Sequence, residues 1–148
     1  MKATESLVDF VRQKAEKQEK GPDWDARRAK WQGDIAHLYG MVRGWLKPLE
    51  SNRTIRVEEA TVTLREDYLG TYKVPEMSIL IGSQKVAFHP KGTLIVGAQG
   101  RVDVSGDASV RTLVVNRGKW AIVDRTEKVR LIPFTEASFR ALLEEVMA

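Results

Sequence analysis

The sequence contains no cysteine. That absence excludes a disulfide scaffold, thiol-dependent catalysis and any zinc or iron–sulfur site that depends on thiolate ligands. Long apolar runs are missing too, and the N-terminus lacks the pattern of a secretory signal peptide. We therefore expect a cytoplasmic protein without membrane contact.

Histidine is scarce, since the chain of 148 residues has only His37 and His89. Neither has a histidine or carboxylate three or four residues further on, so the spacing predicts no metal site. The sequence also lacks Gly-x-Ser-x-Gly, the lysine of a phosphate-binding loop and the dinucleotide fingerprint. We name no catalytic residue and no cofactor. These absences favour a protein that is not an enzyme, without settling the question.

Positive charge is modest and spread out, with a formal net charge of +4 and an isoelectric point of about 9.4. Basic residues exceed acidic ones by three in residues 1–53, by none in 54–100 and by three in 101–134, whereas acidic residues exceed basic ones by two in the last fourteen. A phosphate-binding surface usually shows a denser basic cluster. The charge therefore permits nucleic-acid binding but does not indicate it.

The hydrophobic pattern predicts one α+β domain over residues 1–148. Residues 1–50 are expected to form two helices, residues 54–132 an antiparallel sheet, and residues 135–147 a closing helix. The first helix, over residues 4–19, would carry a narrow apolar stripe. Its members are Leu7, Phe10, Val11 and Ala15.

The second helix has the strongest helical signal. Asp23 can cap it, and from Trp31 onward its apolar residues follow steps of four and three, which place them on one seam. The seam residues are Trp31, Ile35, Leu38, Val42, Trp45 and Leu49. Lys47-Pro48 should end or kink the helix, because the residue before proline avoids the α region. Gly40 and Gly44 each lower the stability of a helix. We expect another strand or helix to pack closely against these two residues and so to compensate for that loss.

The sheet is predicted to be a twisted meander of about seven to nine short strands that can curl toward a half-barrel. Alternating apolar and polar residues indicate strands near 54–65, 71–74, 78–81, 85–89, 93–97, 101–105, 109–116, 119–124 and 128–132. Thr135 is the expected cap of the closing helix, and Phe134 can pack onto Phe139 within it.

Elimination makes a non-enzymatic interaction protein the first hypothesis for function, a small module that acts through protein–protein contact. The second helix carries three tryptophans, and its apolar face could be wider than one core needs. Such a face would leave a patch for another protein or for a second copy of this chain. A homodimer formed through the second helix is therefore open as an alternative to complete burial of the tryptophans.

Two other functions stay open. Nucleic-acid binding would use basic residues of the second helix and the later strands, namely Arg27, Arg28, Lys30, Arg117 and Lys119. A small-ligand binder or enzyme would need a pocket in the curved sheet, with Tyr72, His89, Arg101 and Asp103 as wall residues. Because Arg101 and Asp103 alternate with valines on one strand, we predict an ion pair between them on the opposite sheet face.

Overall fold

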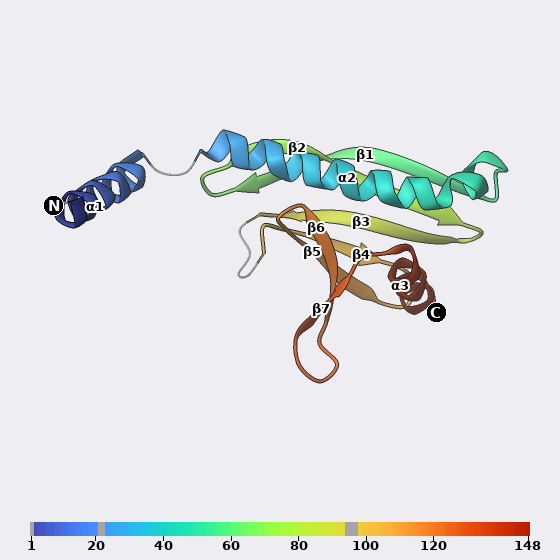
Figure 1. Cartoon of the computed structure of the whole chain (residues 1–148). Coiled ribbons are helices and arrows are strands. Elements are labelled where there is room, and N and C mark those ends of the chain that lie inside the picture. The colour runs from blue at the N-terminus through green and yellow to red at the C-terminus, as the bar shows by residue number, and fades with distance from the viewer. Residues whose placement is uncertain (1, 21–22, 94–97) are drawn as a thin grey trace.

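The computed structural model describes residues 2–20, 23–93 and 98–148. Three helices frame seven strands (Figure 1). The helices are α1 (Lys2–Lys20), α2 (Trp24–Ser51) and α3 (Glu136–Met147). The strands are β1 (Ile55–Glu66), β2 (Gly70–Ile81), β3 (Gln84–Gly92), β4 (Gly100–Ser105), β5 (Val110–Asn116), β6 (Lys119–Asp124) and β7 (Arg130–Pro133).

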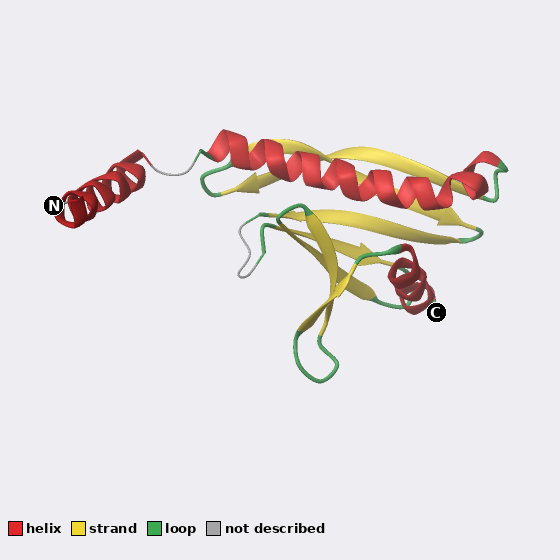
Figure 2. Ribbon diagram, in the orientation of Figure 1, coloured by secondary structure: helices red, strands yellow, loops and turns green. Residues whose placement is uncertain are grey.

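The strands form one antiparallel sheet in which each strand pairs with the next along the chain, in the order β1 to β7. Figure 2 shows the resulting meander with the helices outside it. Tight turns make this topology possible, as at Arg117 and Gly118, which both take positive φ between β5 and β6. The predicted α+β class and antiparallel meander are confirmed.

One face of the sheet packs against α2 and α3. Trp31, Ile35, Leu38 and Val42 of α2 are fully buried in the same cluster as Phe88 of β3 and its strand neighbours. The indole Nε1 of Trp120 donates to the main-chain oxygen of Asp34 at 3.0 Å, so β6 is also tied to α2 by a buried hydrogen bond. The middle of the predicted seam is thus core.

The closing helix forms for the reasons that its sequence indicates. Thr135 accepts a hydrogen bond from the amide of Ser138, and the Ser138 side chain bonds back to the amide of Thr135, which completes a capping box. Phe134 lies 5.7 Å from Phe139, measured between ring centroids. The predicted cap and aromatic contact are both confirmed.

One expectation about α2 is wrong, that another backbone lies close to Gly40 and Gly44. Of the two outcomes expected at Pro48, an end or a kink, the end is not found, because α2 continues through Pro48 to Ser51. Proline at this position removes only the bond to the carbonyl of Gly44, and Gly44 is exposed, so that carbonyl can bond to water. A Cβ added at Gly40 or Gly44 would meet no atom within 4 Å, so no other backbone lies close to either residue.

The sheet also departs from the predicted strands. Residues 71–74 and 78–81 belong to the single strand β2, which runs through Pro75. Pairing of β2 with β3 is found only from Met77 onward, so Pro75 lies outside that ladder. Of the strand predicted at 93–97, residues 94–97 lie outside the described residues. Within the described part of the chain, no helix is both long and apolar enough to cross a membrane.

Candidate functional site

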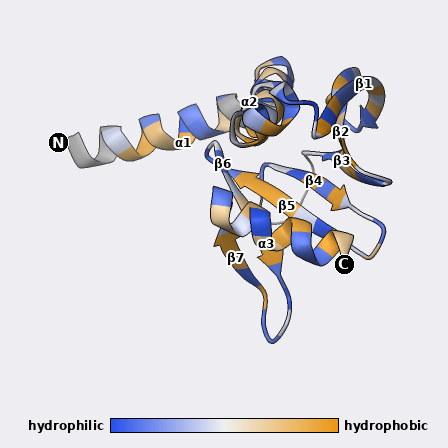
Figure 3. Ribbon diagram, turned by 90° about the vertical axis from the view of Figure 1, so that its right-hand side faces the viewer, coloured by the Kyte–Doolittle hydropathy of each residue, from blue (hydrophilic) through white to orange (hydrophobic). Residues whose placement is uncertain are grey.

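Helix α1 presents an apolar face that no described residue of the chain covers. Every described side chain from Ser6 to Glu16 is exposed. Leu7, Val8, Phe10 and Val11 have exposed fractions of 63%, 48%, 58% and 56%. In Figures 1 and 3 the helix projects away from the sheet and from α2 and α3. The predicted stripe of the first helix therefore exists but is not part of the core.

A second apolar surface lies where the C-terminal half of α2 meets α3. It is a groove of about 410 Å³, which we call the α2–α3 groove. Its lining residues are Trp45, Leu46, Leu49, Glu136, Phe139, Arg140, Leu143, Glu144 and Met147. The four- and three-residue steps of α2 continue past the point where the sheet can cover them, so Leu49 at the end of the seam is 40% exposed.

Aromatic packing makes the floor of the groove rigid. The Trp45 ring lies 5.5 Å from the Phe134 ring and 5.7 Å from the Phe139 ring, measured between centroids. Phe139 in turn lies 6.4 Å from Phe88 of the sheet. Since Phe139 is buried and Trp45 is half-buried, the groove is held in shape by the core beneath it.

Of the residues predicted as pocket walls, three share the outer face of the sheet, opposite α2 and α3. His89 of β3 is the register partner of Asp103 of β4. Arg101 pairs with Asp103 at 2.8 Å, as predicted, and Thr112 donates to the same carboxylate at 3.2 Å. Tyr72 belongs to the buried core cluster and lies elsewhere.

His89 links two further side chains on this outer face. Its Nδ1 lies 2.9 Å from Oε2 of Glu76, and its Nε2 lies 2.9 Å from Oγ of Ser105. An ionised Glu76 can only accept, so Nδ1 carries the proton and, in the neutral ring, Nε2 accepts from the Ser105 hydroxyl. Sequence reasoning missed Glu76 and Ser105, because only strand pairing brings β2, β3 and β4 together here.

This serine–histidine–carboxylate order is the one used by nucleophilic hydrolases, but connectivity alone is not an active site. Five hollows lie over the described residues, and neither His89 nor Ser105 lines any of them. The three side chains stand on the open face of a sheet, where polar residues commonly bond across strands. Among the described residues, no three His, Asp or Glu side chains gather as metal ligands.

Tyr72 has a structural partner. Its hydroxyl donates to Glu66, whose other carboxylate oxygen accepts from the amide of Thr93 at 2.7 Å. Burial raises the pKa of Tyr72 above its ordinary range, and the Glu66 carboxylate adds to that shift, so the hydroxyl stays protonated as a donor. Glu66 thereby ties the end of β1 to the chain that follows β3.

The predicted basic residues come together at one end of the molecule but are mostly engaged. A hollow of about 420 Å³ is lined by Arg27, Lys30 and Gln99, among others, and Oε1 of Gln99 accepts from the amide of Arg117. Arg27 and Arg28 donate to the carbonyls of Thr93 and Leu69, at 3.3 and 2.8 Å. Lys30 pairs with Asp34. Lys119 is exposed at the first position of β6.

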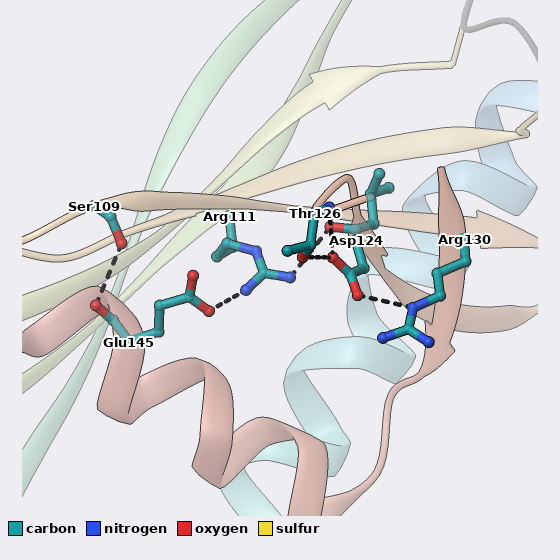
Figure 4. A network of polar contacts seen from close by, with 7 residues as sticks. Ser109, Arg111, Asp124, Thr126, Arg130 and Glu145 are labelled. Atoms are coloured by element: carbon teal, nitrogen blue, oxygen red, sulfur yellow. Dashed lines mark hydrogen bonds and ion pairs between the residues drawn. The ribbon is translucent and has the colours of Figure 1, made fainter. Parts of the chain in front are cut away.

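A polar network joins α3 to the end of the sheet (Figure 4). Arg111 bonds both to the Glu145 carboxylate of α3 and, at 3.2 Å, to the carbonyl of Val123. Next to it, Asp124 accepts from the amide of Thr126 at 3.0 Å and from Arg130 at 2.8 Å. All four charged side chains of the network, on Arg111, Asp124, Arg130 and Glu145, have partners, so we assign it a structural role.

Asp124 should make stability depend on pH. Hydrogen bonds from the Thr126 hydroxyl and amide, and from Arg130, hold the pKa of Asp124 well below its ordinary value. A lowered pKa in the folded state contributes stability that is fully present above the unfolded pKa, about 3.9, and is lost progressively as the pH falls from there through the lower folded-state pKa. We expect Asp124→Asn to lower the urea midpoint at pH 7 and to make less difference at pH 2. An equal loss at both pH values would contradict this assignment.

The chain matches no protein-family model, no curated protein and no solved structure. Two exposed apolar surfaces of the chain bear on its function, namely the face of α1 and the α2–α3 groove. Sequence reasoning found the α1 stripe and part of the groove, through Trp45 and Leu49. It missed Leu46 and Met147, since only the tertiary structure places α3 beside α2.

Proposed function

We propose that this chain is a non-enzymatic interaction protein that acts through protein–protein contact, with α1 as the element that it presents to its partner. The observation that carries the proposal is the set of four large apolar side chains on α1, each about half exposed or more. In proteins most of the stability of a helix comes from packing of its apolar face, and no described residue supplies that packing to Leu7, Val8, Phe10 and Val11. Helices of this kind commonly bind by laying the apolar face into a groove.

The alternative functions have weaker support. For nucleic acid, Arg27, Arg28 and Lys30 already bond to carbonyls or to carboxylates, so phosphate would have to displace those partners. For catalysis, His89 and Ser105 line none of the five hollows described above, and a substrate would have to be held on an open sheet face. Protein contact needs no rearrangement of the folded body.

The proposal predicts that Val11→Asp strongly weakens association. Burial of one valine contributes about 1.5 kcal/mol or more, and so the substitution should weaken binding by at least about tenfold. Light scattering coupled to size exclusion would report assembly above the 16.7 kDa monomer mass, and retention from lysate would report other partners. Both should be lost together with the apolar face.

The matched control is Gln13→Asp, which places the same side chain on the same helix about 200° around its axis from Val11. We expect it to associate as the wild type does. A wild-type chain that stays at 16.7 kDa and retains no protein would overturn the proposal. Binding of α1 to anionic lipid vesicles, lost in Val11→Asp and without any protein contact, would replace it with a membrane role.

A further inference from the structure

We infer that the partner of α1 is a second copy of this chain, and that the apolar face of α1 lies in the α2–α3 groove of that copy. This inference rests on the proposed function, and it names the partner protein and the groove in which α1 binds. It is carried by three features of the described residues: the chemistry of the groove, the charges beside it, and the length of the helices.

The two surfaces match in chemistry. The α2–α3 groove is lined by apolar side chains from two helices, with Leu49, Leu143 and Met147 partly exposed along it. The apolar face of α1 is about 6 Å long from Leu7 to Val11, measured along the helix axis. Helix α3, with its twelve residues, is about 18 Å long, so the groove beside it is long enough for this face. A third helix laid along this groove would bury both surfaces at once.

Their charges are complementary. Helix α3 carries three glutamates and one arginine, and Glu136, Arg140 and Glu144 stand on the rim of the groove. Among the described side chains of α1, those from Arg12 to Glu16 include two basic and one acidic residue, a net charge of +1. Lys14 lies next to the apolar face, with its Nζ 5.8 Å from the centre of the Phe10 ring. The rim carries a net charge of −1, because Arg140 pairs with Glu144 at 3.0 Å and Glu136 remains, so docking would bring opposite net charges together.

The same chain's α1 cannot reach the groove as an intact helix. The part of α1 from Leu7 to Lys20 is about 20 Å long. The part of α2 from Trp24 to Trp45 is about 32 Å long. If α1 folded back along α2, Leu7 would therefore stop about 12 Å short of Trp45. Only three residues separate the two helices in the sequence, which is too few to close that gap in a reversed chain. The occupant must come from another molecule.

Reciprocal exchange makes a closed dimer. Each chain carries one α1 and one groove, so two copies related by a twofold axis can fill both grooves with both helices. The groove includes Trp45, Leu46 and Leu49 of α2, so this arrangement is a homodimer formed in part through the second helix.

Disulfide trapping tests the contact directly, because the native chain has no cysteine. Full-length Val11→Cys is mixed with tagged full-length Leu49→Cys and oxidised mildly. We expect a covalent heterodimer to form at least about tenfold faster than with two matched controls. One control replaces Val11→Cys with Gln13→Cys, and the other replaces Leu49→Cys with Val129→Cys, at an exposed position outside the groove.

The outcomes separate the inference from the proposed function. Equal trapping in all three mixtures would overturn the groove as the site. Rapid trapping of Val11→Cys with itself would show that α1 pairs with α1, which also overturns it. If neither cross-link forms but association is still lost in Val11→Asp, the proposed function stands and the occupant is a different protein. If the wild type does not associate at all, both fail.

Discussion

Replacement of Phe139 by alanine is expected to lower the free energy of unfolding by about 3–5 kcal/mol, the usual loss for a buried phenylalanine. Phe139 is 3% exposed and packs against three aromatic rings, those of Trp45, Phe88 and Phe134. Its removal leaves a cavity where α2, α3 and the sheet meet. Urea unfolding followed by tryptophan fluorescence would measure the loss.

Val129→Ala is the matched control for this substitution. Val129 is 70% exposed, in the turn between β6 and β7, so its truncation should change stability by no more than about 0.5 kcal/mol. Equal urea midpoints for Phe139→Ala and the wild type would contradict the central place of Phe139 in the core. Since Phe139 also lines the α2–α3 groove, Phe139→Ala should weaken self-association as well.

A second large effect is expected at Gly100, where an added methyl group has no room. A Cβ built there would lie 2.2 Å from Cζ3 and 2.4 Å from Cε3 of Trp31, whose side chain is 1% exposed. Overpacking of this kind costs about 1–3 kcal/mol or more, so Gly100→Ala should be clearly less stable than the wild type in urea. The first strand residue of β4 must therefore be small for Trp31 to fit.

Gly44→Ala provides the opposite expectation within the same chain. No atom lies within 4 Å of its added Cβ, and alanine is favoured over glycine in a helix by about 1 kcal/mol, so this variant should be more stable.

A double-mutant cycle that combines Gly100→Ala with Trp31→Phe isolates the contact between these two residues, because a smaller ring should reduce the loss of stability caused by Gly100→Ala. If Gly100→Ala lowers stability equally with Trp31 and with Phe at position 31, the loss does not come from the contact with Trp31.

Local signals predicted most of the secondary structure, and the exceptions have physical causes. Hydrophobic period and capping residues are properties of neighbouring residues, so α3 and its Thr135 cap could be read from the sequence. Pro75 does not close a strand and Pro48 does not end α2, because proline breaks an element only where its missing donor or its ring conflicts with a partner. That partner is known only once the neighbouring backbone is placed.

The candidate site was predictable only in part for the same reason. The stripe of α1 and the seam of α2 have the same kind of pattern, yet the middle of the seam is core and the stripe is exposed. Likewise, His89 was noted from the sequence, but Glu76 and Ser105 reach it only through the pairing of β2, β3 and β4.

The sequence alone thus determined the class of fold, the order of its elements and which side chains are apolar on each. The tertiary structure decided which apolar faces are covered, because burial depends on residues far apart in the chain that the folded sheet brings together. It covers the seam at Trp31 and Ile35 and leaves Val11 and Leu49 exposed. Those uncovered surfaces are the ones that the proposed dimer would join.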